Sequence, residues 1–210
     1  MIFRLWLATV AALICGSQAD AQNKVRTETI RPSVTANPAG KPNAHATPSD
    51  AHNAAGVPDI VTDLSQLPAP VARTRERILA AAQSGDLQKL LTIMQMNETM
   101  PIFSFSDEKD PVAFWKNSYP DSEGIEVLSI LVTLLQTGYV HVDKGTPQEM
   151  YLWPYFTRMP VKNLTPEQKV ELFRIITGND YKDMLDFGAY IFYRVGIGPD
   201  GTWHFFVAGN

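Results

Sequence analysis

The chain has 210 residues, of which 45% are hydrophobic and 19% are charged, and its formal net charge is −4. This length and composition are typical of one or two folded domains, and they exclude a collagen-like or wholly disordered chain. The mild acidity argues against a nucleic-acid-binding protein, which normally carries a basic surface. The single cysteine, Cys15, excludes a small disulfide-linked scaffold.

The first 21 residues have the pattern of a secretory signal peptide. Arg4 gives a positive start, residues 5–14 form an uncharged apolar run, and residues 19–21 (Ala-Asp-Ala) supply the small side chains that signal peptidase requires. The apolar run is too short to span a membrane, which takes about 20 residues. We therefore expect export, with cleavage before Gln22. A lipoprotein acylated at Cys15 and a buried N-terminal helix are the alternatives.

Residues 22–67 are predicted to form a disordered linker. The segment is rich in Pro, Ala, Asn and Thr and has no aromatic residue, so it can bury too little apolar surface to offset the entropy of ordering. His45 and His52 lie inside it and are too few to bind zinc, so we expect them to be solvated. The composition becomes aromatic-rich after this segment, and we expect residues 68–210 to form a single globular domain.

The patterns after the linker predict an α+β fold, with several helices packed on a small antiparallel sheet. Apolar spacing and capping residues predict helices over 71–84, 86–95, 110–116, 123–137, 165–177 and 181–187. Runs of β-branched and aromatic residues predict strands over 102–105, 139–143, 149–153, 189–195 and 202–207. We expect the apolar helix 123–137 to be central, and Val170, Phe173 and Ile176 to face inward.

Residues 196–201 (Gly-Ile-Gly-Pro-Asp-Gly) match the glycine spacing of a dinucleotide-binding loop. That function requires a helix N-terminus after the loop, so that amide groups meet the pyrophosphate. Here a predicted strand follows, and we interpret the segment as the turn of a C-terminal β-hairpin. The sequence also lacks the motifs of serine hydrolases, zinc proteases, phosphate-binding loops and EF-hands, and we expect no cofactor.

The predicted domain contains two histidines, His141 and His204, each on a predicted strand. A general base would need one of them beside a carboxylate. Asp143 lies on the same strand face as His141, and Glu149 follows soon after. We prefer hydrogen-bonded or half-exposed strand histidines, and the alternative is an unconventional hydrolase site built from both histidines and nearby carboxylates.

Two further charged groups are compatible with binding sites. Residues 180–186 carry an aspartate at every third position, which we interpret as a helix cap and a solvated face rather than a cation site. We therefore expect no metal. Arg73, Arg75 and Arg77 form either a small basic patch or, as we prefer, the exposed first turn of a helix.

Four aromatic residues surround Pro154, which cannot continue the hydrogen-bonded ladder of a strand. The exposed end of such a strand can offer aromatic faces to a glycan, a peptide or another small molecule. On this basis Trp153, Tyr155, Tyr190 and His204 are the candidate ligand-binding residues. The alternative is that these rings belong to the hydrophobic core.

Four segments carry a resemblance to a known group of proteins: residues 145–149, 153–156, 164–168 and 201–209. They resemble a group of exported alphaproteobacterial proteins that share a domain of unknown function. The resemblance covers residues 67–210, implies a periplasmic location in a Gram-negative cell, and implies no catalytic residue. Separately, residues 81–87 are similar to the opening helices of NTF2-like domains.

These observations favour a non-enzymatic binding or interaction module of the cell envelope, tethered by its linker and not spanning the membrane. Its ligand would be a small molecule, a glycan or a peptide. An envelope hydrolase is the second hypothesis, and a structural role in the envelope is the third.

Overall fold

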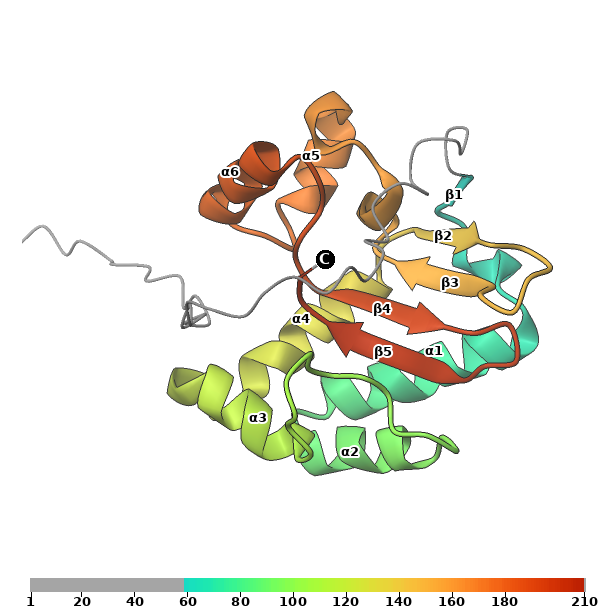
Figure 1. The fold of residues 1–210 in the computed structure, drawn as a ribbon, viewed down its shortest axis with the longest axis vertical. Coiled ribbons are helices and arrows are strands. Elements are labelled where there is room, and N and C mark those ends of the chain that lie inside the picture. Colours follow the sequence, from blue (N-terminus) through green and yellow to red (C-terminus); the bar gives the residue numbers. More distant parts are fainter. Residues whose placement is uncertain (1–58, 210) are drawn as a thin grey trace, which may run out of the picture. The chain divides into compact units, whose positions relative to one another are not determined.

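The computed structural model describes residues 59–209, which form an α+β fold with a C-terminal hairpin, as predicted (Figure 1). The strands are β1 (Ile60–Val61), β2 (Tyr139–Val142), β3 (Met150–Trp153), β4 (Arg194–Ile197) and β5 (Trp203–Val207). The α-helices are α1 (Ala69–Gln83), α2 (Leu87–Gln95), α3 (Pro111–Ser118), α4 (Ile125–Leu135), α5 (Pro166–Leu172) and α6 (Gly178–Phe187). Short 3-10 helices are η2 (Leu64–Gln66), η3 (Pro120–Ser122), η4 (Tyr155–Arg158) and η5 (Val161–Asn163).

The five strands form one antiparallel sheet in the order β1-β2-β3-β4-β5, so each strand pairs with the strand before it. Side chains of successive strand residues point to opposite faces. Trp153 and Val195, which are register partners, therefore lie on one face, and Leu152 lies on the other. Within the described range, no helix has the length and apolar character needed to cross a membrane.

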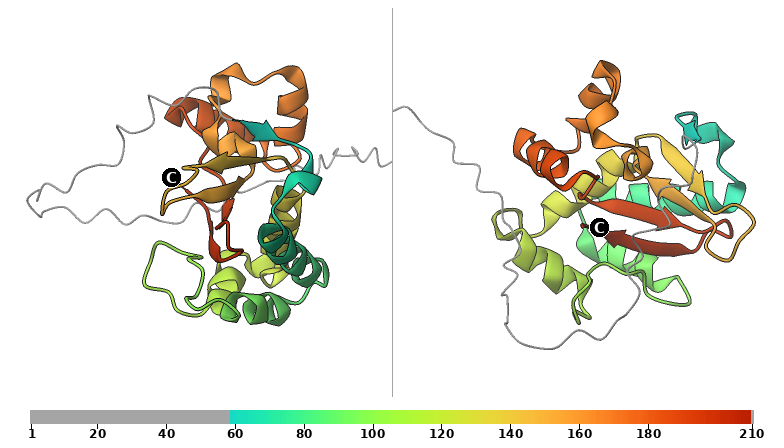
Figure 2. Two further views of the ribbon diagram at one scale, coloured as in Figure 1. Left: turned by 90° about the vertical axis from the view of Figure 1, so that its right-hand side faces the viewer. Right: turned by 45° about the horizontal axis from the view of Figure 1, so that its top comes forward.

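The first face of the sheet packs against α1 to α4. Leu131 of α4 and Ile78 of α1 are fully buried there, in one hydrophobic cluster with Trp153 and Trp203 of the sheet. Five residues of α4 are buried, which agrees with the prediction that this apolar helix is central. Figure 2 shows α1 and α4 on one side of the sheet, with α5 and α6 away from them.

The second face is covered by η4, η5, α5 and α6. Leu152 from the sheet, Phe156 from η4, Leu172 from α5 and Met184 from α6 are buried together in a second cluster. The sheet is therefore covered on both faces, on this side by two α-helices and two 3-10 helices.

Side-chain caps begin four of the six α-helices, namely α2, α3, α5 and α6. The side chain of Asp86 accepts a hydrogen bond from the backbone N–H of Gln88, and Asp110 accepts from the N–H groups of Val112 and Ala113. These bonds satisfy amide groups that the first helical turn leaves without a partner.

The predicted helix 165–177 is wrong in its second half, because α5 ends at Leu172. The chain turns there, and a second reciprocal cap between Thr177 and Asp180 starts α6, so that Gly178 opens a helix instead of ending one. The inward face predicted for a continuous helix therefore does not form. Val170 and Phe173 are exposed, whereas Ile176 is buried as expected.

The folded region begins earlier than the predicted boundary at residue 68. Ile60 and Val61 pair with β2, and Leu67 belongs to the hydrophobic core. The prediction of a linker to residue 67 is therefore wrong for residues 59–67, because two β-branched residues are enough to extend a sheet edge. The predicted signal peptide, Cys15 and the rest of the predicted linker lie outside the described residues.

Two predicted strands are shorter than expected. Residues 189–193 precede β4 without joining its ladder, and the strand predicted over 102–105 is reduced to a single parallel bridge from Ile102 to Phe205. The backbone N–H of Ile102 donates to the carbonyl of His204 at 2.9 Å, and the N–H of Phe206 donates to the carbonyl of Ile102 at 2.8 Å. The connection between α2 and α3 therefore lies along the outer edge of β5.

Candidate functional site

The structure does not bring the four candidate ligand-binding residues onto one surface. Trp153 is 0% exposed on the first face of the sheet, whereas Tyr155 and Tyr190 are buried in the cluster on the second face. The Tyr155 hydroxyl donates to Oε2 of Glu171 at 2.8 Å, and the Tyr190 hydroxyl donates to a backbone carbonyl at 2.8 Å. Burial raises the pKa of both phenols. Only His204 of the four is exposed.

The two histidines do not form one acid–base site. His141 is on β2 and His204 is on β5, so two strands separate them, a distance of about 14 Å at the usual strand spacing. Each has a different acidic neighbour. His204 lies beside Gly198 and Asp200 at the hairpin turn, whereas His141 contacts Glu149.

His141 and Glu149 form a hydrogen-bonded pair where the β2–β3 loop begins and ends. Nε2 of His141 is 2.7 Å from Oε1 of Glu149, and the imidazole stacks on the ring of Tyr151 with a centroid distance of 4.1 Å. The other carboxylate oxygen, Oε2, accepts the backbone N–H of Gly145 at 2.9 Å. The hydrogen bond from Gly145, followed by the one with His141, lowers the pKa of Glu149. This carboxylate therefore joins the strand to its own loop.

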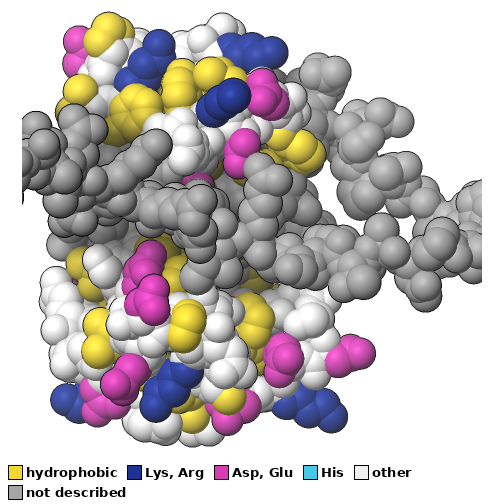
Figure 3. All heavy atoms as spheres, turned by 90° about the vertical axis from the view of Figure 1, so that its left-hand side faces the viewer, with side chains coloured by type: hydrophobic (Ala, Val, Ile, Leu, Met, Phe, Trp, Pro, Cys, Tyr) yellow, Lys and Arg dark blue, Asp and Glu magenta, His cyan; other side chains and the backbone are white. Residues whose placement is uncertain are grey.

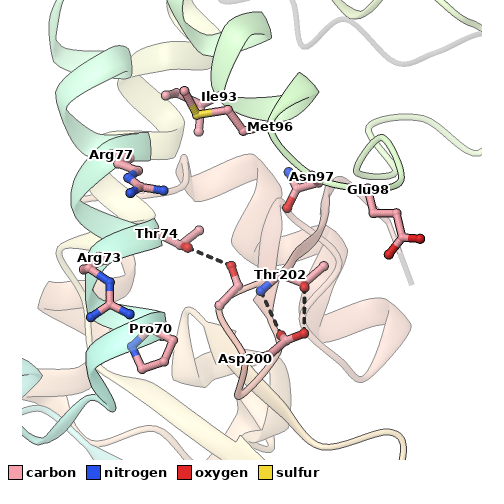
Figure 4. Close-up of a pocket in the computed structure, with 11 residues that line it drawn as sticks. Pro70, Arg73, Thr74, Arg77, Ile93, Met96, Asn97, Glu98, Asp200 and Thr202 are labelled. Carbon is pink, nitrogen blue, oxygen red and sulfur yellow. Dashed lines mark hydrogen bonds between the residues drawn. The ribbon is translucent and has the colours of Figure 1, made fainter.

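A cavity of about 350 Å³ lies between α1, the end of α2 and the β4–β5 turn (Figure 4). We call it the arginine pocket. It is lined by one face of α1 (Pro70, Arg73, Thr74 and Arg77), by Ile93 and Met96–Glu98, and by Asp200–Thr202. Figure 4 shows the two arginines on the α1 wall, with Asp200 and Thr202 across the cavity.

Helical spacing divides the three arginines of α1 between two surroundings. Arg73 and Arg77 are four residues apart and lie on the pocket face. Arg75 lies elsewhere on the helix, where its Nε donates to the carbonyl of Leu135 at 2.9 Å and so caps the end of α4. Burial lowers the pKa of Arg75. Arg73 and Arg77 are exposed, as expected, whereas Arg75 is half-buried and has a structural role.

The hairpin turn lies directly on α1, and this contact forms the floor of the pocket. The Thr74 hydroxyl donates to the carbonyl of Gly201 at 2.7 Å (Figure 4). Gly201 has a φ of +91°, and a Cβ at this position would be 2.8 Å from the carbonyl oxygen of Pro70. Both its backbone conformation and this close approach favour glycine. The segment is a turn, as predicted, because the strand β5 follows it.

The charged side chains of the arginine pocket differ in whether they form hydrogen bonds within the protein. Both carboxylate oxygens of Asp200 accept hydrogen bonds from Thr202, one from its backbone N–H at 2.9 Å and one from its hydroxyl at 2.8 Å. These bonds lower the pKa of Asp200, and it remains ionised. Among residues 59–209, the exposed side chains of Arg73, Arg77 and Glu98 have no hydrogen bond or ion pair, so the pocket offers two guanidinium groups and one carboxylate to a ligand.

The wall of the arginine pocket opposite α1 is polar, and hydrogen bonds hold it in place. The Asn97 side chain accepts the backbone N–H of Trp203 through Oδ1 at 3.0 Å and donates to the carbonyl of Met94 at 3.0 Å. Asn97 therefore links the end of α2 to β5. Glu98 lies on the rim opposite the arginines (Figure 4).

A different surface carries exposed apolar side chains. Val170, Phe173 and Phe187 are exposed on α5 and α6 and in the turn between them. Figure 3 shows hydrophobic side chains over this part of the molecule, interspersed with basic and acidic ones.

The described residues contain no group of three His, Cys, Asp or Glu side chains arranged to hold a metal ion. Comparisons with protein-family models, with curated proteins and with solved structures found no match.

The sequence contained one signal for the arginine pocket, the spacing of Arg73 and Arg77 on a predicted helix. It contained no signal for the opposite wall, because Thr74 and Gly201 are 127 positions apart. The turn chemistry of residues 198–201 predicted the hairpin, but it did not predict which helix the hairpin contacts.

Trp153→Ala is expected to lower the free energy of unfolding by about 3–5 kcal/mol, because it removes a fully buried side chain. His204→Ala is the control, and as an exposed substitution it should change stability by less than about 0.5 kcal/mol. Urea denaturation followed by circular dichroism measures both. A Trp153→Ala variant as stable as the parent would return this residue to the list of surface-binding candidates.

Stability should decrease at acidic pH in a way that depends on Glu149. Because its pKa is lower in the fold than its ordinary value of 4.5, its contribution is fully present above pH 4.5 and is lost as the pH falls through the lowered pKa. Glu149→Gln should therefore be less stable than the parent at about pH 6.5, and the difference should shrink at about pH 3.5. Denaturant titrations at both pH values measure this, with exposed Glu108→Gln as the control. A difference that is independent of pH would contradict the assignment.

Proposed function

We propose that this protein is a non-enzymatic binding module of the cell envelope that binds a small organic carboxylate in the arginine pocket. The observation that carries the proposal is the pair Arg73 and Arg77, which face one cavity without a partner among the described residues. The cavity volume of about 350 Å³ suits a small ligand.

The chemistry of the pocket favours an anion over a neutral ligand. A guanidinium presents a planar set of N–H donors that matches the two oxygens of a carboxylate. The formal charges of the pocket sum to zero, but neither arginine forms an ion pair with Asp200, whose oxygens accept hydrogen bonds from Thr202, or with Glu98, which lies on the opposite rim. The guanidinium donors therefore have no carboxylate partner among the described residues. Asn97 adds a polar side chain to the opposite wall, whereas both donors of Thr202 are already bonded to Asp200.

The His141–Glu149 pair is the observation that favours the second candidate, an envelope hydrolase. A carboxylate that orients an imidazole is a common arrangement for a general base. A base also needs a bound substrate within reach, and neither residue lines the arginine pocket. Glu149 is also bonded to Gly145, which gives the pair a structural explanation. Binding at the arginine pocket is therefore the better-supported function.

The envelope location rests on the amino-acid sequence. The charged start, apolar run and Ala-Asp-Ala segment of residues 1–21 support export, and the resemblance to exported alphaproteobacterial proteins supports the periplasm.

Arg73→Gln and Arg77→Gln should each weaken carboxylate binding about tenfold or more, because each removes a charge-assisted hydrogen bond. Isothermal titration calorimetry of the full chain with acetate, succinate and citrate measures the effect. Arg174→Gln, which removes an exposed arginine between α5 and α6, should leave the affinity unchanged. The proposal fails if none of the three carboxylates binds, or if both pocket variants bind as the parent does.

Export should leave a chain that begins at Gln22 and contains no thiol. Expression in a Gram-negative host, followed by intact-mass spectrometry of the periplasmic fraction, measures this. A mass that retains residues 1–21, or one that includes a lipid on Cys15, would contradict the proposed processing.

A further inference from the structure

A second cavity lies next to the arginine pocket, between α1 and α2. Its volume is about 380 Å³, and it shares Arg77 and Ile93 with the arginine pocket. We call it the apolar hollow. On α1 its wall consists of Ala80, Ala81 and Ser84, which follow Arg77 at the spacing of one helical face. On α2 its wall consists of Lys89, Thr92 and Ile93, so its apolar part is formed by the two alanines and Ile93. The two cavities therefore meet at Arg77 and Ile93, and we call them together the groove.

The two ends of this groove differ in chemistry. Arg73 and Arg77 lie at the hairpin end, whereas the small side chains of Ala80 and Ala81 leave an apolar surface opposite Ile93. Ala81 is buried and Ile93 is half-buried, whereas the other lining residues are exposed, so the hollow is open to solvent. Arg77 belongs to both cavities, because an arginine can place its methylene chain along an apolar surface and its guanidinium in a polar one.

We propose that the ligand of the groove is an amphiphilic carboxylate, with its carboxylate group at Arg73 and Arg77 and its alkyl chain in the apolar hollow. This inference rests on the proposed function, since it names the class of carboxylate that the arginine pocket binds. The apolar hollow extends from Arg77 to Ser84, which is about 10 Å of helix. A chain of medium length, such as that of octanoate, is therefore the expected occupant.

The distribution of charge selects this occupant over simpler ones. A purely apolar molecule would have to lie against two guanidinium groups without pairing them, which carries a desolvation cost. A small anion such as acetate would pair the arginines but would leave the apolar hollow in contact with water. An amphiphilic carboxylate satisfies both ends, because burial of its chain adds to the affinity of its charged group.

The test compares acetate, octanoate and octylammonium by calorimetry on the full chain, with octanoate kept below the concentration at which it forms micelles. We expect octanoate to bind at least tenfold more tightly than acetate, and octylammonium to bind more weakly than octanoate. Ala80→Gln places a larger polar side chain in the apolar hollow and should remove the advantage of octanoate without changing acetate binding. Ala113→Gln makes the same change at an exposed position of α3 and should have no effect.

Each remaining outcome overturns a different statement. Equal affinity for acetate and octanoate, or an advantage of octanoate that survives in Ala80→Gln, would overturn the inference and leave the proposed function in place. Equal binding of octanoate and octylammonium would overturn the assignment of the carboxylate to the arginines. If neither carboxylate binds, the proposed function fails with the inference. Melting curves of both variants establish that a loss of binding is not a loss of folding.

Discussion

The contact between the β4–β5 turn and the first turns of α1 is the interaction on which the rest of the structure depends. Gly201 approaches Pro70 so closely that a side chain would separate them, and Thr74 fixes the approach with a hydrogen bond. The same helix packs on α4 and on the first face of the sheet. One contact therefore sets both the position of the hairpin over the core and the width of the arginine pocket. The site is built from two rigid elements that also form part of the hydrophobic core.

Most of the fold could be predicted from the sequence, because its signals are local. Asp86 and Asp110 cap helices through bonds to residues two or three positions away, and the Gly-Pro-Asp-Gly turn fixes a hairpin within a few residues. One error occurred where two local signals competed. Gly178 has the composition of a helix stop, but the reciprocal bonds of Thr177 and Asp180 begin a new helix there. The predicted inward face of the continuous helix was therefore wrong for Val170 and Phe173.

The candidate site was much less predictable, because it depends on tertiary contacts. The aromatic residues around Pro154 were conspicuous in the sequence, yet Trp153 and Tyr155 lie in different clusters on opposite faces of the sheet. Composition does not distinguish a core aromatic residue from a binding one. The contact between His141 and Glu149 was easier to expect from the sequence, because the two residues lie near the loop that joins the paired strands β2 and β3. The arginine pocket joins residues from opposite ends of the described chain. From the sequence, the spacing of Arg73 and Arg77 could predict only the wall formed by α1.

The segment along the outer edge of β5 limits how another polypeptide can associate with this sheet. A free edge strand offers unpaired backbone groups that a peptide or a second copy can join as an additional strand. Here the backbone of Ile102 and the side chain of Asn97 already occupy donor and acceptor groups of β5. At the opposite edge, β1 is two residues long. Strand addition at β5 would first have to displace the α2–α3 connection, so recognition at this edge must act through side chains.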